Sequence, residues 1–132
     1  IMSSIFTKII NREIQAYILY ENKNFISILD INPLTHGHSL VIPKVEIDYF
    51  FELDDIYLSE IMTFSKVVSN ALSKSVSCER VGLSIVGLEV PHAHVHLIPF
   101  NNEKEMSFSN KRLNFSEDQF LELQKKIIKN LN

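Results

Sequence analysis

Short apolar segments alternate with polar turns along the chain, and five of these segments are typical of β-strands. They are rich in β-branched and aromatic residues, and asparagine, glycine or proline bounds most of them. The turn "ENKN" joins the first two segments, and Pro43 ends the third. The predicted strands are "AYILYEN" (16–22), "NFISILDI" (24–31), "SLVIP" (39–43), "RVGLSIVG" (80–87) and "AHVHLIPF" (93–100).

The longest amphipathic stretch predicts a helix from about Leu53 to Val76, and Asp54 and Asp55 suit its N-terminus. Its apolar stripe consists of Tyr57, Ile61, Phe64, Val68, Ala71 and Leu72. Further apolar residues outside this stripe are Leu58, Met62 and Val67. A helix that is apolar nearly all round needs a second surface to cover it, which favours a homodimer.

Two shorter helices are expected at the ends of the chain. Ser4 is suited to begin the first, whose inward-facing residues would be Ile5, Phe6 and Ile9. Ser116 and Gln119 have the spacing of a capping box before the last helix, and the polar segment 101–114 is expected to be a loop. Strands, a long helix, further strands and a final helix together predict an α+β domain with a mainly antiparallel five-stranded sheet.

Composition narrows the class of protein. A chain of 132 residues with 45% hydrophobic and 22% charged residues is typical of one globular domain. A net charge of −3 argues against broad nucleic-acid binding, so any anionic ligand must be held by local donors. Cys78 has no partner for an intrachain disulfide, and no apolar run approaches the ~20 residues that span a bilayer. We therefore expect a cytoplasmic protein with no membrane partner and no nucleic-acid partner.

The stretch "PHAHVHLIPF" contains histidine at every second position, namely His92, His94 and His96. Spacing of two is the period of a strand, so the three imidazoles would point to one face while Ala93 and Val95 point to the other. Three such imidazoles could bind zinc, or they could serve a catalytic site.

A second segment favours the catalytic interpretation over the zinc site. Together, "LDINPLTHGHSLVIPK" (29–44) and "GLEVPHAHVHLIP" (87–99) resemble the histidine-triad (HIT) nucleotide-binding family, and the Hint-like bacterial branch in particular. The family signature alternates three histidines with apolar residues and ends in two apolar residues, and residues 92–98 match it fully. The resemblance covers about residues 4–100 of a single domain spanning 1–132, and implies the HIT-like fold. The loop and helix of about 101–132 lie outside it.

The resemblance implies attack on the α-phosphorus of a nucleoside phosphate derivative by the middle histidine, here His94. A nucleotidyl-histidine forms and water then hydrolyses it; the substrate would be a nucleoside phosphoramidate or a dinucleoside polyphosphate. Imidazole suits this role because its pKa of about 6.5 leaves it mostly neutral at pH 7. By resemblance His96 contacts the phosphate and leaving group, and His92 supports the site. No cofactor is needed for the attack, although Mg²⁺ could accompany a polyphosphate.

The resemblance also implies binding residues for the nucleotide. Asp30 matches the acid that binds ribose, whose two hydroxyl donors suit the two oxygens of a carboxylate. His38 matches a fourth histidine beside the triad, whereas His36 is interpreted as a surface loop residue. The candidates for an apolar slot that holds the base are Leu29, Ile31 and Leu40.

Two departures from the family pattern leave alternatives open. Leu88 and Glu89 stand where glutamine and a hydroxyl residue are common, and Glu89 could either protonate a leaving group or repel a phosphate. A non-catalytic nucleotide-binding module is therefore one alternative, and a zinc enzyme using the three strand histidines is another. Ser4 and Thr7 stand where some relatives carry zinc-binding cysteines, so no structural zinc of that type is expected.

Overall fold

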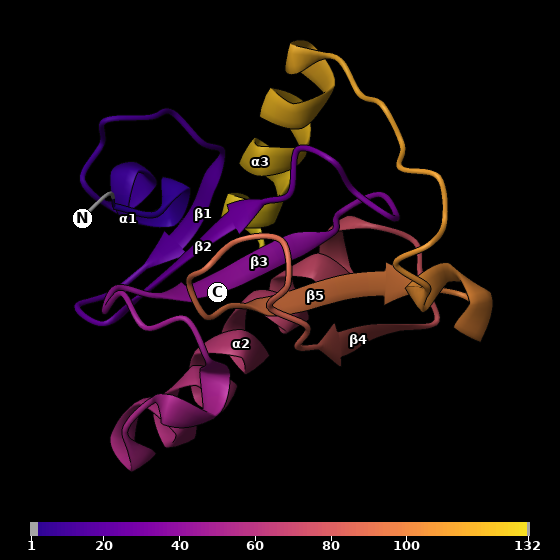
Figure 1. The fold of residues 1–132 in the computed structure, drawn as a ribbon. Helices are drawn as coiled ribbons and strands as arrows, with labels where there is room; N and C mark the ends of the chain where they lie inside the picture. Colours follow the sequence, from indigo (N-terminus) through magenta and orange to yellow (C-terminus); the bar gives the residue numbers. More distant parts are fainter. Residues whose placement is uncertain (1–2, 132) are drawn as a thin grey trace.

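The computed structural model describes residues 3–131, and its elements form an α+β domain around one five-stranded sheet (Figure 1). The strands are β1 (Ile18–Glu21), β2 (Phe25–Leu29), β3 (Ser39–Pro43), β4 (Arg80–Ser84) and β5 (Val95–Phe100). The helices are α1 (Ile5–Ile10), α2 (Asp55–Ser75) and α3 (Glu117–Lys129), with two short 3₁₀ turns, Phe50–Glu52 and Glu103–Met106. The predicted fold class and the order of the elements are confirmed.

All neighbouring strands pair antiparallel, in the order β1-β2-β3-β5-β4. The central pair is β3 and β5, in which Leu40 lies opposite His96 and Val41 opposite Val95. Because side chains alternate between the faces of a strand, this register gives His96 and Leu40 one face of the sheet and Val41 and Val95 the other.

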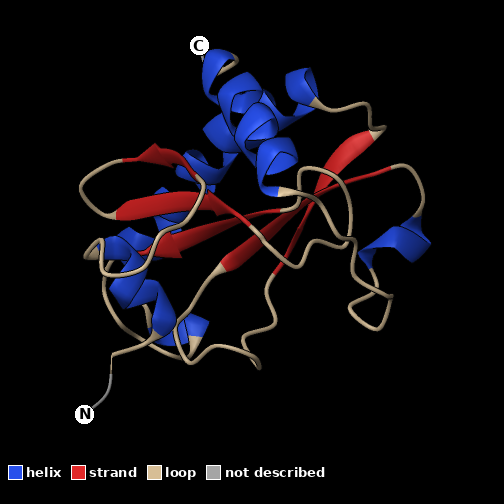
Figure 2. Cartoon of the chain, turned by 90° about the horizontal axis from the view of Figure 1, so that it is seen from above, coloured by secondary structure: helices blue, strands red, loops and turns tan. Residues whose placement is uncertain are grey.

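Helices cover the two faces unequally. α2 and α3 pack on the face that carries Val41 and Val95, and their buried side chains form the larger core cluster. α1 packs on the opposite face, where Phe6 and Ile9 contact Ile26, Ile28, Leu40 and Ile42. Figure 2 shows α3 on the far side of the strands from α1. The face that α1 only partly covers is the one that carries His96.

The helix caps follow the predicted chemistry. The Ser4 hydroxyl accepts the backbone N–H of Thr7 at the start of α1, and Ser116 forms the predicted capping box with Gln119 at the start of α3. α2 buries the predicted stripe, and no helix within residues 3–131 has the length and apolarity to cross a membrane. The segment expected to be all loop, 101–114, contains the 3₁₀ turn Glu103–Met106.

One prediction about side-chain direction and one about a strand boundary were wrong. Ile5 was expected to face inward but is half exposed, because the short α1 buries only Phe6 and Ile9. The strand expected from Ala93 begins at Val95, so His92 and His94 precede it. The reason is that the N–H of Ala93 donates to the Ile47 carbonyl (2.7 Å) and the N–H of His92 to the Val90 carbonyl (2.8 Å), outside the β3–β5 ladder.

Candidate active site

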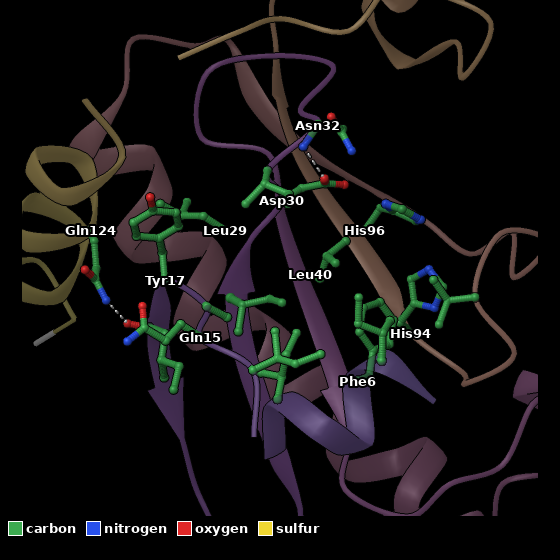
Figure 3. Close-up of a pocket in the computed structure, with 18 of the residues that line it drawn as sticks. Phe6, Gln15, Tyr17, Leu29, Asp30, Asn32, Leu40, His94, His96 and Gln124 are labelled. Atoms are coloured by element: carbon green, nitrogen blue, oxygen red, sulfur yellow. Dashed lines mark hydrogen bonds between the residues drawn. The ribbon is translucent and has the colours of Figure 1, made fainter. Parts of the chain in front are cut away.

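A cavity of about 920 Å³ lies between α1, the strands and the N-terminal half of α3. Its walls are largely apolar, with Phe6 and Ile9 from α1, Leu40 from β3, and Tyr17 on the side near α3. One end is polar and carries Asp30, Asn32, His94 and His96 (Figure 3). Glu89 also belongs to the cavity lining. A volume of this size is typical of a small-molecule site, and an apolar wall with convergent polar groups is its usual lining.

His94 is held in a single tautomer. Its Nδ1–H donates to the backbone carbonyl of His92 at 2.7 Å, so the lone pair of Nε2 is left for other partners. The edge of the Phe6 ring packs against the imidazole, with 5.0 Å between centroids. Burial lowers the pKa of His94, so the ring is neutral at pH 7. Within residues 3–131 no hydrogen bond engages Nε2, and a neutral, oriented imidazole with that lone pair on a cavity wall is arranged to act as a nucleophile.

His92 lies on the same side of the sheet as the other two triad rings, as the alternation predicts: its ring packs edge-on against Phe6 of α1, which also contacts His94, while Ala93 and Val95 belong to the core on the other face. Its ring is fully buried and does not line the cavity. Nε2–H donates to the Pro43 carbonyl at 2.8 Å, and Nδ1 accepts from the Ser4 hydroxyl at 2.7 Å. These two hydrogen bonds hold the ring against α1 and away from the cavity.

The contacts of His92 continue into α1. The Thr7 hydroxyl donates to Glu46, and the Ser4 backbone N–H donates to the same carboxylate oxygen at 2.8 Å. Glu46, Thr7, Ser4 and His92 thus form one hydrogen-bonded chain that ends at the carbonyl that holds His94. Its physical effect is to fix the peptide of His92, since both ring nitrogens are engaged.

His38 sits beside the triad as expected and orients His96. The backbone N–H of Leu34 donates to Nδ1 of His38 at 2.9 Å, so Nε2 of His38 carries the proton. That proton is shared with Nδ1 of His96 at 2.9 Å, which leaves an N–H on Nε2 of His96. Burial, reinforced by neighbouring positive groups, lowers the pKa of both rings to about 3. His96 is therefore a neutral hydrogen-bond donor at the polar end of the cavity.

Asp30 follows β2 and lies at the same end of the cavity. Its Oδ1 accepts the backbone N–H of Asn32 at 2.8 Å, and its side chain is only 15% exposed. Burial raises the pKa of Asp30 to about 6, so the carboxylate is mostly ionised at pH 7. His38 Nε2 approaches Oδ2 at 3.5 Å, but a neutral imidazole makes this a polar contact and not an ion pair. The three predicted slot residues also line the cavity: Leu29, Ile31 and Leu40.

Comparison with known proteins identifies the family. The sequence pattern of the HIT domain matches residues 11–103, about two-thirds of the chain. The chain belongs to the histidine-triad family. An uncharacterized HIT-like protein of Borreliella burgdorferi is 38% identical over 135 residues, covering 96% of this chain and 97% of that protein. An adenosine 5'-monophosphoramidase of Saccharomyces cerevisiae is 36% identical over 101 residues, covering 76% and 64% of the two chains.

Solved structures of the histidine-triad family share the fold. A hypothetical histidine triad nucleotide-binding protein from Sulfolobus tokodaii has a TM-score of 0.81 and 33% identity, covering 96% of this chain and 90% of that chain. A zinc-bound histidine triad family protein from Mycobacterium smegmatis has a TM-score of 0.83 and 26% identity, covering 98% and 94%. These alignments extend over nearly the whole chain, including the C-terminal helix that the family pattern does not reach.

Two residues of the C-terminal segment lie near the triad, and the sequence analysis did not predict them as site residues. The Phe108 ring packs edge-on against His96, with 4.7 Å between centroids. The Arg112 guanidinium lies over Phe108 at 5.6 Å, donates to the Asn32 carbonyl at 2.7 Å, and approaches the Glu89 carboxylate at 3.4 Å. No local signal could have placed them, because their partners are up to 80 residues away in sequence. His36, in contrast, is exposed as expected.

The side chains that could hold a metal differ from the expected trio. Within residues 3–131, Asp30, His38 and His96 are the one group whose ligand atoms lie within 4.8 Å of one another. His92 is not among them, and both its ring nitrogens bond to protein atoms. In the expected zinc-cysteine positions, the hydroxyls of Ser4 and Thr7 bond to His92 and Glu46.

Proposed function

We propose that this protein is a nucleotide-binding hydrolase or transferase that cleaves at the α-phosphorus of a nucleoside phosphoramidate or a dinucleoside polyphosphate. The observation that carries the proposal is the tautomer of His94, whose Nδ1–H is bonded to the His92 carbonyl at 2.7 Å while Nε2 remains a nucleophile. The likeness to a yeast adenosine 5'-monophosphoramidase supports the same chemistry.

The cavity accommodates each part of such a substrate. The base would lie among the apolar side chains Leu29, Ile31 and Leu40, and the ribose diol would donate to the ionised Asp30. The α-phosphate would then reach the polar end, where His94 and His96 line the wall. Nε2–H of His96 would donate to a phosphate oxygen or to the departing atom.

The reaction would proceed in two displacements. Nε2 of His94 forms a bond to phosphorus as the bond to the leaving nitrogen or oxygen breaks, and a leaving amine takes up a proton from water. The Nδ1–H of the resulting nucleotidyl-imidazolium stays on the His92 carbonyl, which stabilises its positive charge. Water then attacks phosphorus, releases a proton to solvent, and frees Nε2. A covalent intermediate divides one hard displacement into two easier ones.

No metal takes part in the proposed attack, and Mg²⁺ would serve only to neutralise the charge of a polyphosphate leaving group. The zinc alternative based on His92, His94 and His96 loses support, because a shared zinc would require His92 to give up a hydrogen bond to Ser4 or Pro43. Zinc analysis of protein purified without chelator tests this alternative, which requires one tightly bound zinc per chain.

A non-catalytic nucleotide-binding module is the second candidate. The observation in its favour is the stretch before the triad, where Leu88 is 89% exposed and Glu89 leans toward Arg112. Neither side chain supplies the amide or hydroxyl that relatives commonly place there. This candidate predicts nucleotide affinity without any covalent adduct.

Intact-mass analysis separates the two candidates. The protein is mixed briefly with adenosine phosphoramidate or a diadenosine polyphosphate and quenched in alkaline denaturant, in which phosphorus–imidazole bonds survive. We expect a gain of one adenylyl mass located on His94, and its absence from the His94→Asn protein. The matched control is His36→Asn, which alters an exposed loop histidine and should retain the adduct. An adduct on another residue, or turnover by the His94→Asn protein, would refute the assignment of the nucleophile.

We also propose a homodimer that covers the outer side of α2. Met62 is 52% exposed there, and Leu58 and Val67 are only partly buried. Light scattering should give twice the chain mass, and Met62→Glu should reduce it to that of a monomer.

Because the lone Cys78 suits a reducing compartment, we propose a cytoplasmic location as well.

A further inference from the structure

The proposed function places an anionic phosphate at the polar end of the cavity, where the histidines supply no positive charge to balance it. His38 and His96 are neutral at pH 7, because burial lowers the pKa of both to about 3. Asp30 and Glu89 contribute carboxylates to the same lining. A phosphate ester carries at least one negative charge, so without a cation it would meet repulsion in a partly dehydrated site.

Arg12 lines the cavity but is paired with Glu21. Arg112, in contrast, lies outside the lining and contacts Asn32 of the polar end and Glu89 of the lining. Its positive charge lowers the pKa of Asp30, His38 and His96, although burial has the larger effect on each. All three groups therefore sense the guanidinium, which reaches the rim of the cavity through its contacts with Asn32 and Glu89. Of the groups that affect these three pKa values, Arg112 is the one with a permanent positive charge.

The position of Arg112 is fixed by its surroundings. The backbone N–H of Leu113 donates to the Pro33 carbonyl at 2.8 Å, and Nη1 of Arg112 donates to the Asn32 carbonyl at 2.7 Å. The face of Phe108 supports the guanidinium, and the same ring packs against His96. The cation is thus held one aromatic ring away from a triad histidine, with its side chain 24% exposed.

The contact with Glu89 is weaker than the others. It joins Nη2 of Arg112 to Oε1 at 3.4 Å, and the Glu89 side chain is 77% exposed, so the pair contributes little stability. A guanidinium has five N–H donors, and a phosphate accepts two of them side by side with good geometry. An incoming phosphate could therefore replace Glu89 at little cost.

We infer that Arg112 forms an anion subsite at the rim of the cavity, which binds a non-reacting phosphate oxygen of the nucleotide in exchange for Glu89. The subsite is supplied by the chain beyond residue 103, where the match to the HIT domain ends. The family-matched segment carries the histidines, and the C-terminal segment carries the charge that the phosphate needs. Until a phosphate arrives, Glu89 is a weakly bound counter-ion of Arg112, while the Asn32 carbonyl and the Phe108 ring hold the guanidinium in place.

The test compares AMP with adenosine, which differ by the phosphate. Isothermal titration of the Arg112→Gln protein should show AMP affinity lowered by about 10- to 100-fold and adenosine affinity changed by less than about twofold. Lys111→Gln is the matched control, since it removes the same charge from the exposed neighbouring residue and should leave both affinities nearly unchanged. Thermal melting of each variant establishes that it is folded.

Glu89→Gln tests the exchange itself. Removal of the competing carboxylate should tighten AMP binding and leave adenosine binding unchanged, whereas weaker AMP binding would show that Glu89 positions Arg112 and is not displaced. Equal losses of AMP and adenosine in Arg112→Gln, or AMP affinity equal to the parental value, would overturn the subsite while leaving the proposed function standing. A parental protein that binds neither ligand would overturn both.

Discussion

Replacement of Asp30 by asparagine should stabilise the fold at neutral pH while it impairs ribose recognition. Asparagine keeps the shape of the side chain and an oxygen that can accept the Asn32 N–H, so the 2.8 Å hydrogen bond is retained. What is lost is a negative charge in a site that is only 15% exposed. Such a charge destabilises the native state unless a cation or enough hydrogen bonds compensate for its burial.

The magnitude follows from the pKa of Asp30, which burial raises from 3.8 to about 6. Below pH 3.8 the carboxyl is protonated in both states and has no effect on stability. Between pH 3.8 and about 6 the unfolded chain ionises first, so native stability falls as the pH rises, and above about 6 the penalty is constant. The full penalty is about 3 kcal/mol, and roughly half of it is present at pH 5.

Urea denaturation at pH 5 and at pH 8 measures this difference. The advantage of Asp30→Asn over the parental protein should grow by about 1 kcal/mol or more between the two pH values. The control is Asp48→Asn, an exposed carboxyl whose replacement should change stability by less than about 0.5 kcal/mol at either pH. If Asp30→Asn destabilised the protein equally at both pH values, burial would not be the dominant influence on this carboxylate.

The remaining predictions concern the support of the site. Asp30→Asn should weaken AMP more than its 2′,3′-dideoxy analogue, and equal losses would remove the ribose role. Ser4→Ala should lower kcat more than it raises KM, because it frees the His92 ring behind the nucleophile; steady-state kinetics that change KM alone would contradict this. Gly37→Ala should destabilise the fold by about 1 kcal/mol or more, since φ is +92° and the added Cβ would lie 3.2 Å from Pro99, and an unchanged melting curve would count against this steric argument. Dialysis against EDTA should leave phosphoramidate hydrolysis unchanged, and a loss restored by zinc would revive the metal alternative.

Local pattern was sufficient where local contacts decide the structure. The bounds of β3 and the capping box at Ser116 were predictable because proline, serine and glutamine act on residues within four positions of themselves. Asp30 and His38 could be placed beside the triad only through the family resemblance, and the β3–β5 pairing and the His38–His96 hydrogen bond show how that proximity arises.

The features that pattern missed depend on contacts distant in sequence. The strand was expected to begin at Ala93, but Ala93 bonds to Ile47 and the strand starts two residues later. The burial of His92 outside the cavity depends on its hydrogen bonds to Ser4 and Pro43. Phe108 and Arg112 lie in a polar segment without periodicity, and the bond from Leu113 to Pro33 brings that segment to the site. Where only tertiary contacts fix the position of a side chain, the sequence around that residue does not predict it.

The pairing of Leu40 with His96 would make the proposed activity depend on correct folding. A register shift of one residue in β5 relative to β3 would place the His96 imidazole in the hydrophobic core beneath α2 and turn Val95 or Leu97 toward the cavity. A misaligned molecule would therefore be both poorly soluble and inert. A screen that selects variants by turnover would therefore also select against register shifts. The variants it retains would be those that form the β3–β5 pairing correctly.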